Sequence, residues 1–156
     1  MQFRQYYPLE IPENGTLCLV KPHILKDARV GEVLQSILDA GFTTYAYHSV
    51  HLSLQMAEEI MDAYKTVYPS YSKMMDHLCS GPVVAVAIVG SENVVKEFRE
   101  YCGPIEPLVA QTLRCDSLRA IFGVDVVKNA VHCTDLPEDG AMEISYFFDT
   151  IAKLEK

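Results

Sequence analysis

The apolar run from Val83 to Val89 constrains the fold of this chain more than any other stretch. It contains only Val, Ala and Ile, and it lies between a Ser-Gly-Pro turn signal at 80–82 and Gly90. A short, unbroken and mostly β-branched run of this kind predicts a strand that is buried on both faces. The run is far shorter than the roughly 20 residues that cross a membrane. We therefore expect it at the centre of the sheet of a globular domain.

Strand and helix patterns alternate on both sides of this central strand. Further strands are predicted at 16–20, 42–52 and 124–131, where apolar and β-branched residues run or alternate. Helices are predicted at 30–40, from 54 to a Tyr-Pro break at 68–69, from there to about 79, at 93–101 and at 137–148. Residues 102–118 are predicted to be a long, mostly irregular loop, which in a compact domain is usually functional.

Without its inserted pieces, this order reduces to βαββαβ. The pattern predicts a ferredoxin-like α+β fold, in which helices pack on one face of a four-stranded antiparallel sheet. The 156 residues suffice for one domain with a real core. We assign residues 1–15 to a leader or linker, 16–148 to the folded domain and 149–156 to a short C-terminal tail.

Charge and cysteine content exclude several classes of protein. The formal net charge of -8 argues against binding to a nucleic-acid backbone, although a local cluster of cations could still hold a small anion. The five cysteines are odd in number and form no CxxC pair, which predicts free thiols in a reducing compartment. No stretch is typical of a signal peptide or a membrane span, so we expect a soluble, cytoplasmic domain.

His132 is the candidate nucleophile. We expect it on a strand-to-helix connection, where backbone amides and the hydroxyl of Thr134 could hold an anion. Glu143 could hydrogen-bond one ring nitrogen of His132 and leave the other free to attack. The alternative is a partly buried histidine that only makes structural hydrogen bonds, which is the commoner role.

Several cations are expected around this histidine. Lys21 follows the first strand, Arg99 lies on a helix and Arg119 follows the long loop, with Asn129 close to His132 in sequence. Two arginines and a lysine suit a phosphoryl group, because its transfer depends mostly on positioning and charge stabilisation. A lysine at a strand end is as often a snorkelling surface charge. His48 and His51 would lie on opposite faces of a strand, so we expect no metal site there.

Several sequence blocks occur in order over nearly all of 16–148. They are Leu19-Val20-Lys21-Pro22, Val30-Gly31-Glu32, Ser80-Gly81-Pro82-Val83-Val84-Ala85, Asn129 with His132 and Asp135, and Glu143 before Tyr146-Phe147-Phe148. With these blocks the sequence resembles the nucleoside diphosphate kinase family. The stretches 98–104, 118–123 and 129–140 resemble, within that family, the second kinase domain of the homologue 7 branch, which is associated with cilia and centrosomes. On this resemblance the chain is either one domain of a larger protein or a standalone relative.

The resemblance implies a ping-pong reaction. His132 would take the γ-phosphate of ATP or another nucleoside triphosphate as phosphohistidine and pass it to a nucleoside diphosphate. Glu143 would orient His132, and Thr134 would supply a hydroxyl that the family usually takes from serine. Mg²⁺ would bridge the phosphates of the nucleotide, with few or no protein ligands. Family members form dimers that assemble into tetramers or hexamers, so a homo-oligomer is expected.

The resemblance also assigns the nucleotide contacts. Lys21 and Asn129 would bind the sugar region, and Arg99 and Arg119 would hold the phosphates. The position of the base-stacking phenylalanine falls on Ser70 by counting, and Tyr71 or Tyr68 could replace it if the register shifts. Stacking on an aromatic ring contributes roughly 1–3 kcal/mol, so its loss would weaken nucleotide affinity by one or two decades.

Three further positions depart from the family pattern. The glycine that usually follows the catalytic histidine is Cys133, and a threonine that usually touches phosphate aligns with Ile105. The tyrosine that usually lies near the histidine aligns with Met61. These departures keep the chemistry but weaken the nucleotide clamp.

Three hypotheses follow from the sequence. The first is an active nucleoside diphosphate kinase. The second is a kinase-fold interaction domain with weak or no turnover, which would bind a ciliary, centrosomal or microtubule partner. The third is redox control at Cys133, because a thiol beside a catalytic histidine can be partly ionised; the alternative for Cys133 is a small apolar filler.

Overall fold

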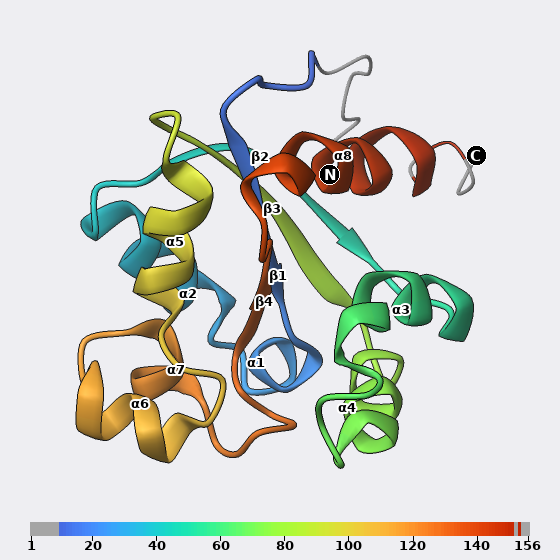
Figure 1. The fold of residues 1–156 in the computed structure, drawn as a ribbon, viewed down its shortest axis with the longest axis vertical. Coiled ribbons are helices and arrows are strands. Elements are labelled where there is room, and N and C mark those ends of the chain that lie inside the picture. Colours follow the sequence, from blue (N-terminus) through green and yellow to red (C-terminus); the bar gives the residue numbers. More distant parts are fainter. Residues whose placement is uncertain (1–9, 152, 154–156) are drawn as a thin grey trace.

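The computed structural model describes residues 10–151 and 153, around a four-stranded antiparallel sheet in the order β2-β3-β1-β4 (Figure 1). All three pairs of neighbouring strands are antiparallel, with β3 and β1 in the middle. This order confirms the ferredoxin-like α+β prediction. The strands are β1 (Gly15–Val20), β2 (Thr43–Val50), β3 (Val83–Val89) and β4 (Val131–Cys133).

Most of the predicted helices are present, and capping residues set their ends. The Ser53 hydroxyl accepts a hydrogen bond from the Met56 amide at the start of α3, and Gly41 follows α2 with a left-handed φ of 92°. The helices are α1 (Pro22–Lys26), α2 (Val30–Asp39), α3 (Leu54–Met61), α4 (Tyr71–Leu78), α5 (Val94–Cys102), α6 (Pro107–Leu113), α7 (Leu118–Phe122) and α8 (Gly140–Ser145), with 3-10 turns η1 (Asp62–Tyr64) and η2 (Pro137–Asp139) and a π-helical segment η3 (Tyr146–Ile151).

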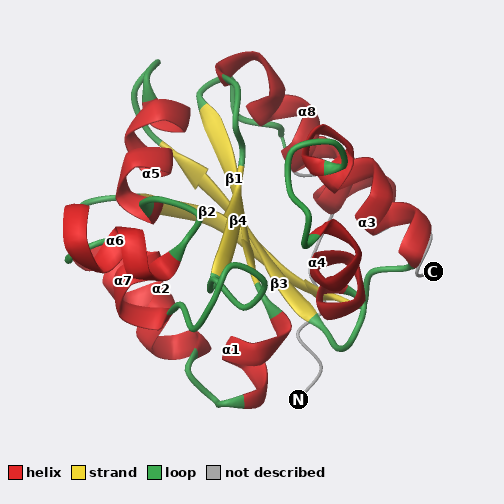
Figure 2. Cartoon of the chain, turned by 60° about the horizontal axis from the view of Figure 1, so that its bottom comes forward, coloured by secondary structure: helices red, strands yellow, loops and turns green. Residues whose placement is uncertain are grey.

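Helices cover both faces of the sheet, so the prediction of a single helical face is wrong. Figure 2 shows α3, α4 and α8 on one side and α2, α5 and α7 on the other. The side chains of β1 alternate between two buried clusters, with Leu17 and Leu19 in one and Cys18 and Val20 in the other. Because β1 is buried at every position, one layer of helices would leave an apolar face of the sheet in water.

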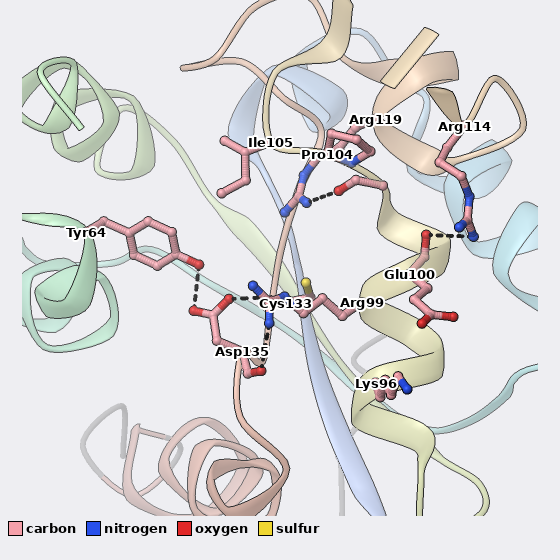
Figure 3. Close-up of a pocket in the computed structure, with 11 residues that line it drawn as sticks. Tyr64, Lys96, Arg99, Glu100, Pro104, Ile105, Arg114, Arg119, Cys133 and Asp135 are labelled. Atoms are coloured by element: carbon pink, nitrogen blue, oxygen red, sulfur yellow. Dashed lines mark hydrogen bonds and ion pairs between the residues drawn. The ribbon is translucent and has the colours of Figure 1, made fainter. Parts of the chain in front are cut away.

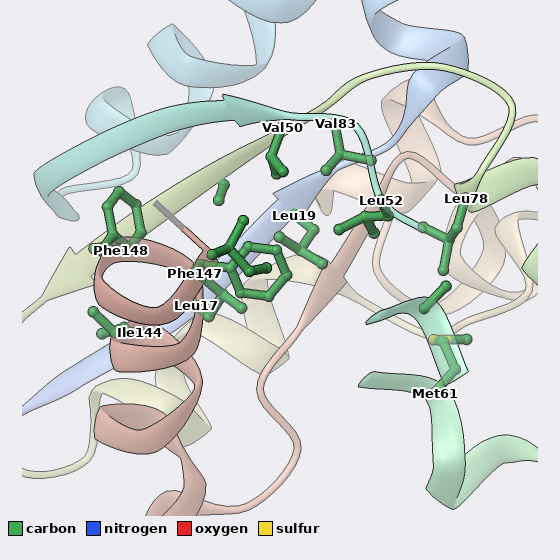
Figure 4. Close-up of a cluster of buried hydrophobic side chains, with 14 of the residues drawn as sticks. Leu17, Leu19, Val50, Leu52, Met61, Leu78, Val83, Ile144, Phe147 and Phe148 are labelled. Atoms are coloured by element: carbon green, nitrogen blue, oxygen red, sulfur yellow. The ribbon is translucent and has the colours of Figure 1, made fainter. Parts of the chain in front are cut away.

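One of these clusters fixes the C-terminal helix against β1 (Figure 4). Phe147 and Phe148 are each 1% exposed and share the cluster with Leu17 and Leu19. Burial of one such side chain contributes about 1.5–3 kcal/mol. Helix α8 comes so close to β1 that a Cβ atom added at Gly140 would collide with a backbone carbonyl oxygen of β1.

Residues 102–118 are more regular than the sequence predicted. Pro107 occupies the first turn of α6, where its missing amide hydrogen costs nothing, and Ser117 caps α7 by accepting a hydrogen bond from the amide of Ala120. The prediction of a mostly irregular loop missed these helices, because their seven and five residues are too short for a clear period.

The last strand is shorter than predicted and begins later. Residues 124–130 form a turn, in which the Asp125 carboxylate accepts hydrogen bonds from the amides of Val127 and Lys128. Aspartate competes for backbone donors in this way, so the apolar residues around it do not extend the sheet. His132 therefore lies within β4 and not on a connection after it.

The predicted boundaries of the domain lie partly outside the described residues. Of the predicted leader 1–15, residues 1–9 lie outside the described part of the chain, and Gly15 already belongs to β1. Of the predicted tail 149–156, residues 152 and 154–156 lie outside it, and the helical path continues through Ile151. Within the described residues, no helix is both long and apolar enough to span a membrane.

Candidate active site

Strand pairing brings Lys21 and His132 together. His132 lies opposite Leu19 in the β1–β4 register, and the backbone amide of Lys21 donates to the carbonyl of Ala130 over 2.9 Å. Lys21 is 3% exposed and His132 is 4% exposed. Ala130 has a left-handed φ of 77°, and non-glycine residues usually adopt this conformation only where their surroundings enforce it.

A small cavity of about 10 Å³ adjoins the ring of His132. That volume holds about one water molecule. The cavity therefore has no room for a phosphate in this conformation. Its lining contains five of the residues that sequence reasoning assigned to the site, Lys21, Ile105, Arg119, Asn129 and His132, together with Met61, Tyr64, Met74 and Val131.

Burial sets the protonation state of His132. It lowers the pKa of the imidazole to about 4; the charge of Asp135 opposes this shift, and the charges of Lys21 and Arg119 add to it. The ring is therefore neutral at pH 7 and keeps a nitrogen lone pair for attack. Its Nε2 atom is buried and has no hydrogen-bond partner among the described residues.

Lys21 carries a weakened charge beside this ring. Burial and the nearby positive charge of Arg119 lower the pKa of its ammonium to about 7. Its Nζ donates to the carbonyl of Val127 over 3.4 Å. A phosphate that entered the site would raise this pKa again, because an opposite charge favours the protonated form.

Arg119 is a buried arginine that binds backbone carbonyls. Its guanidinium donates to the carbonyl of Gly103 over 2.6 Å and to that of Val131 over 3.1 Å. Its Nε has no partner among the described residues. Arg119 thus joins Gly103, which follows α5, to β4, and its Nε–H is an unused donor.

A second cavity of about 490 Å³ lies outside the small one (Figure 3). Tyr64, Ile105 and Arg119 line both cavities, so these three side chains stand between His132 and the outer space. Arg99 lines only the outer cavity of the two. The predicted phosphate ligands are therefore divided between an inner and an outer compartment.

Tyr64 is the side chain that covers His132. Its ring meets the imidazole edge-on at 5.9 Å between centroids, and its hydroxyl donates to Oδ2 of Asp135 over 2.6 Å. Arg99 reaches Asp135 from the other side, with 3.8 Å between Nε and Oδ1 and a 3.3 Å hydrogen bond from Nη1 to the backbone carbonyl (Figure 3). We call this set of contacts around Asp135 the Tyr64–Asp135 latch.

Glu143 differs from its predicted contact. Its Oε2 accepts a 2.6 Å hydrogen bond from Thr134, whose hydroxyl also accepts from the amide of Leu17 over 3.0 Å. No hydrogen bond between Glu143 and His132 is present among the described residues, so the predicted orienting contact is not formed here. Thr134 follows β4 directly and its amide still pairs with the carbonyl of Leu17, so its side chain, two residues from His132, lies on the same face as His132.

The nucleotide-clamp residues are only partly brought to the site. Ser70 immediately precedes α4 and Tyr71 begins it, and neither lines the cavity beside His132. Tyr68 stacks on the ring of Tyr64 at 5.6 Å. The amide of Asn129 donates to the backbone carbonyl of Ile105 over 3.1 Å, while the Ile105 side chain lines both cavities.

Sequence reasoning gave no role to Tyr64 and only a motif position to Asp135. Tyr64 falls on the apolar side of the predicted α3 helix, which is the signal of a core residue. In the structure the ring of Tyr64 lies against His132 and lines the cavity beside it. A tyrosine at a helix end, followed within four residues by Tyr68, was the available clue.

A neutral buried histidine beside a lysine and an arginine, on a ferredoxin-like sheet, has the features of a phosphotransferase site. Comparison with known proteins agrees with this class. Residues 14–152 match the family model described as nucleoside diphosphate kinase. The chain belongs to the nucleoside diphosphate kinase family.

Two of the relatives differ in how much of their own length the chain covers. The chain is 48% identical over 135 residues to the mouse protein named nucleoside diphosphate kinase homolog 7, covering 86% of this chain and 34% of that protein. It is 38% identical over 133 residues to the nucleoside diphosphate kinase of Chlamydia muridarum, covering 85% of this chain and 91% of that enzyme. The chain thus spans about a third of the length of the homolog 7 relatives it matches and nearly all of the bacterial one.

Solved structures show the same fold. A crystal structure of the Aquifex aeolicus nucleoside diphosphate kinase superposes with a TM-score of 0.79 at 30% identity, covering 88% of this chain and 96% of that one.

Proposed function

We propose that this chain is a nucleoside diphosphate kinase domain that carries the transferred phosphoryl group on His132. The observation that carries the proposal is the neutral, buried imidazole of His132 with Lys21 and Arg119 lining the same cavity. An uncharged ring keeps the lone pair that attack on phosphorus requires. The two cations stabilise the negative charge on the phosphoryl oxygens.

The reaction has two symmetrical halves. A nitrogen of His132 attacks the γ-phosphorus of a nucleoside triphosphate; the nitrogen–phosphorus bond forms, and the bond to the β-phosphate oxygen breaks. The nucleoside diphosphate leaves, and a second diphosphate reverses the step from the phosphohistidine. Glu143 would orient the ring by accepting the Nε2 proton, since that atom lacks a partner and Glu143 already binds Thr134 on the same face of β4.

Magnesium would enter together with the nucleotide. The side chains that line the cavity beside His132 are cationic or uncharged, which suits phosphate oxygens and does not suit a bare cation. When bound, Mg²⁺ would neutralise part of the charge on the phosphates. Lys21, Arg119 and Arg99 would position those phosphates, with Asn129 near the sugar.

The direct test is intact-mass spectrometry at alkaline pH after brief mixing with ATP and Mg²⁺. We expect one added phosphoryl group that is acid-labile, discharged by GDP and absent from the variant His132→Asn. The asparagine variant keeps the size and polarity of the site, so it serves as the matched control. A folded protein that gains no phosphoryl group, or a variant that still gains one, would refute the proposal.

The enclosure of His132 favours a second candidate function. A domain whose nucleophile has no room for phosphate, and whose base-stacking position is Ser70, could act mainly by binding a microtubule or centrosomal protein with little turnover. Co-sedimentation with polymerised tubulin tests this candidate. Rapid turnover together with no co-sedimentation would exclude it.

We also propose that the domain forms homo-oligomers. Exposed apolar side chains lie on α6, on α7 and two residues after α7, which offers a surface for a second copy. Sedimentation equilibrium is expected to show dimers or larger species, and monomers at all concentrations would contradict this. The exposed residues are Leu108, Val109, Leu113, Ile121 and Val124.

A further inference from the structure

Three cysteine thiols from distant parts of the sequence meet in one buried cluster. Cys18 on β1 lies opposite Cys133 on β4 in the strand register, and Cys102 at the end of α5 joins both in the same hydrophobic cluster. All three are free and buried. Successive residues of a strand point to opposite faces, so Cys133 lies on the face of β4 that His132 does not occupy.

Cys133 differs from the other two thiols in its surroundings. It lines the outer cavity of about 490 Å³ together with Arg119, whereas Cys18 and Cys102 do not. The neighbouring Cys102 thiol lowers the pKa of Cys133 to about 7; burial opposes this shift, and the positive charge of Arg119 adds to it. Burial instead raises the pKa of Cys18 and Cys102. Only Cys133 of the three thus combines an ionisable thiol with a path to solvent.

We propose that Cys133 and Cys102 form an oxidisable pair, in which Cys133 reacts with a hydroperoxide and Cys102 then closes a disulfide. The Cys133 thiolate attacks the terminal oxygen of the hydroperoxide; the sulfur–oxygen bond forms, the oxygen–oxygen bond breaks and an alkoxide leaves, which takes up a proton as alcohol. The Cys102 thiol then attacks the sulfenic sulfur of Cys133. A sulfur–sulfur bond forms, and hydroxide leaves as water with the thiol proton.

Oxidation would change the site through Arg119 and β4. Arg119 would lose its thiolate partner, and β4 would be drawn toward the end of α5 one residue away from His132. The consequence for activity rests on the proposed function. Since a misplacement of about 1 Å can cost about 100-fold in rate, we expect phosphohistidine formation to fall by about that factor and to recover in dithiothreitol.

Peptide mapping of the full chain after treatment with hydrogen peroxide tests the pair without any activity measurement. Each cysteine falls in its own tryptic peptide, at 5–26, 74–96, 100–114, 115–119 and 129–153. The expected product is a crosslink between peptides 100–114 and 129–153. Oxidation of the exposed Cys115 while Cys133 stays free would overturn the proposal, and so would a crosslink from Cys18 to Cys133.

Variants separate the role of Cys133, which reacts with the hydroperoxide, from that of Cys102, which closes the disulfide. In Cys102→Ala the crosslink cannot form, and we expect a sulfenic acid at Cys133 that dimedone traps. The matched control Cys115→Ala removes the exposed thiol and is expected to form the crosslink normally. Absence of the dimedone adduct in Cys102→Ala would overturn the order of steps. Crosslinked protein that is phosphorylated at the full rate would overturn the proposed effect of the disulfide on phosphohistidine formation. Reduced protein that is never phosphorylated would refute the kinase proposal and leave the crosslink result intact.

Discussion

Removing one hydroxyl group from Tyr64 should expose the nucleophile. The variant Tyr64→Phe keeps the ring against His132 but loses the 2.6 Å hydrogen bond to Asp135. In the closed conformation the cavity beside His132 measures about 10 Å³, so phosphate reaches the ring only after the Tyr64 side chain moves. The hydrogen bond from Tyr64 to Asp135 therefore stabilises the closed conformation relative to an open one in which Tyr64 has moved away from His132.

The magnitude follows from the type of hydrogen bond. A bond to a charged acceptor contributes about 1.5–3 kcal/mol. Since about 1.4 kcal/mol corresponds to a factor of 10, its loss should raise the open population by roughly 10- to 100-fold while that population stays small. Phosphohistidine formation at limiting ATP is proportional to this population, and we expect a rate increase of at least about 10-fold.

Rapid-quench measurement of phosphohistidine at ATP concentrations well below saturation checks this expectation. Tyr68→Phe is the matched control, because it removes a hydroxyl from the stacked neighbour and leaves the Tyr64–Asp135 hydrogen bond in place. The control should react at the wild-type rate. An unchanged or slower rate in Tyr64→Phe would show that the hydroxyl does not restrain the site and would refute the latch.

Three further outcomes are expected. Because burial lowers the pKa of Lys21 to about 7, the unfolded chain binds more protons than the folded chain between pH 7 and 9. The free energy of unfolding should therefore rise by about 2 kcal/mol over that range. Urea titrations of Lys21→Met should not show this rise. The pKa of His132 is lowered to about 4, so the wild type should lose about 2 kcal/mol relative to His132→Asn as the pH falls from 6.5 to 4.5, and an unchanged difference would contradict a neutral buried ring. Gly140→Ala should cost about 1–3 kcal/mol, because its Cβ would collide with β1. The control Gly31→Ala, where a Cβ meets nothing within 4 Å in α2, should stabilise by up to about 1 kcal/mol, as thermal melting would show.

The sheet and its chemistry could be predicted because their signals are local. The run at Val83–Val89 is apolar throughout and that at Gly15–Val20 is apolar except for Thr16, so their strands and their central position follow from hydrophobic periodicity. Lys21 and His132 stand at or near the ends of such runs, and β1–β4 pairing brings them together. The pattern therefore contained both the elements and the approximate place of the site.

The errors arose where a tertiary contact or a single polar residue decides the conformation. Asp125 captures two backbone amides and turns a predicted strand into a loop. Tyr64 binds a carboxylate 71 residues away, and no local pattern encodes that contact. Glu143 was expected on His132 but binds Thr134, a difference of one neighbouring side chain that spacing cannot resolve.

The pairing of β1 with β4 also bears on how the domain is made. Lys21 is synthesised first, and the strand that places His132 beside it follows more than a hundred residues later. Contacts of such long sequence separation form late and slowly, since a large loop must close first. A nascent or truncated chain can thus contain the lysine and most of the sheet without any nucleophile. Phosphorylation of His132 would accordingly mark a domain whose synthesis and folding are complete.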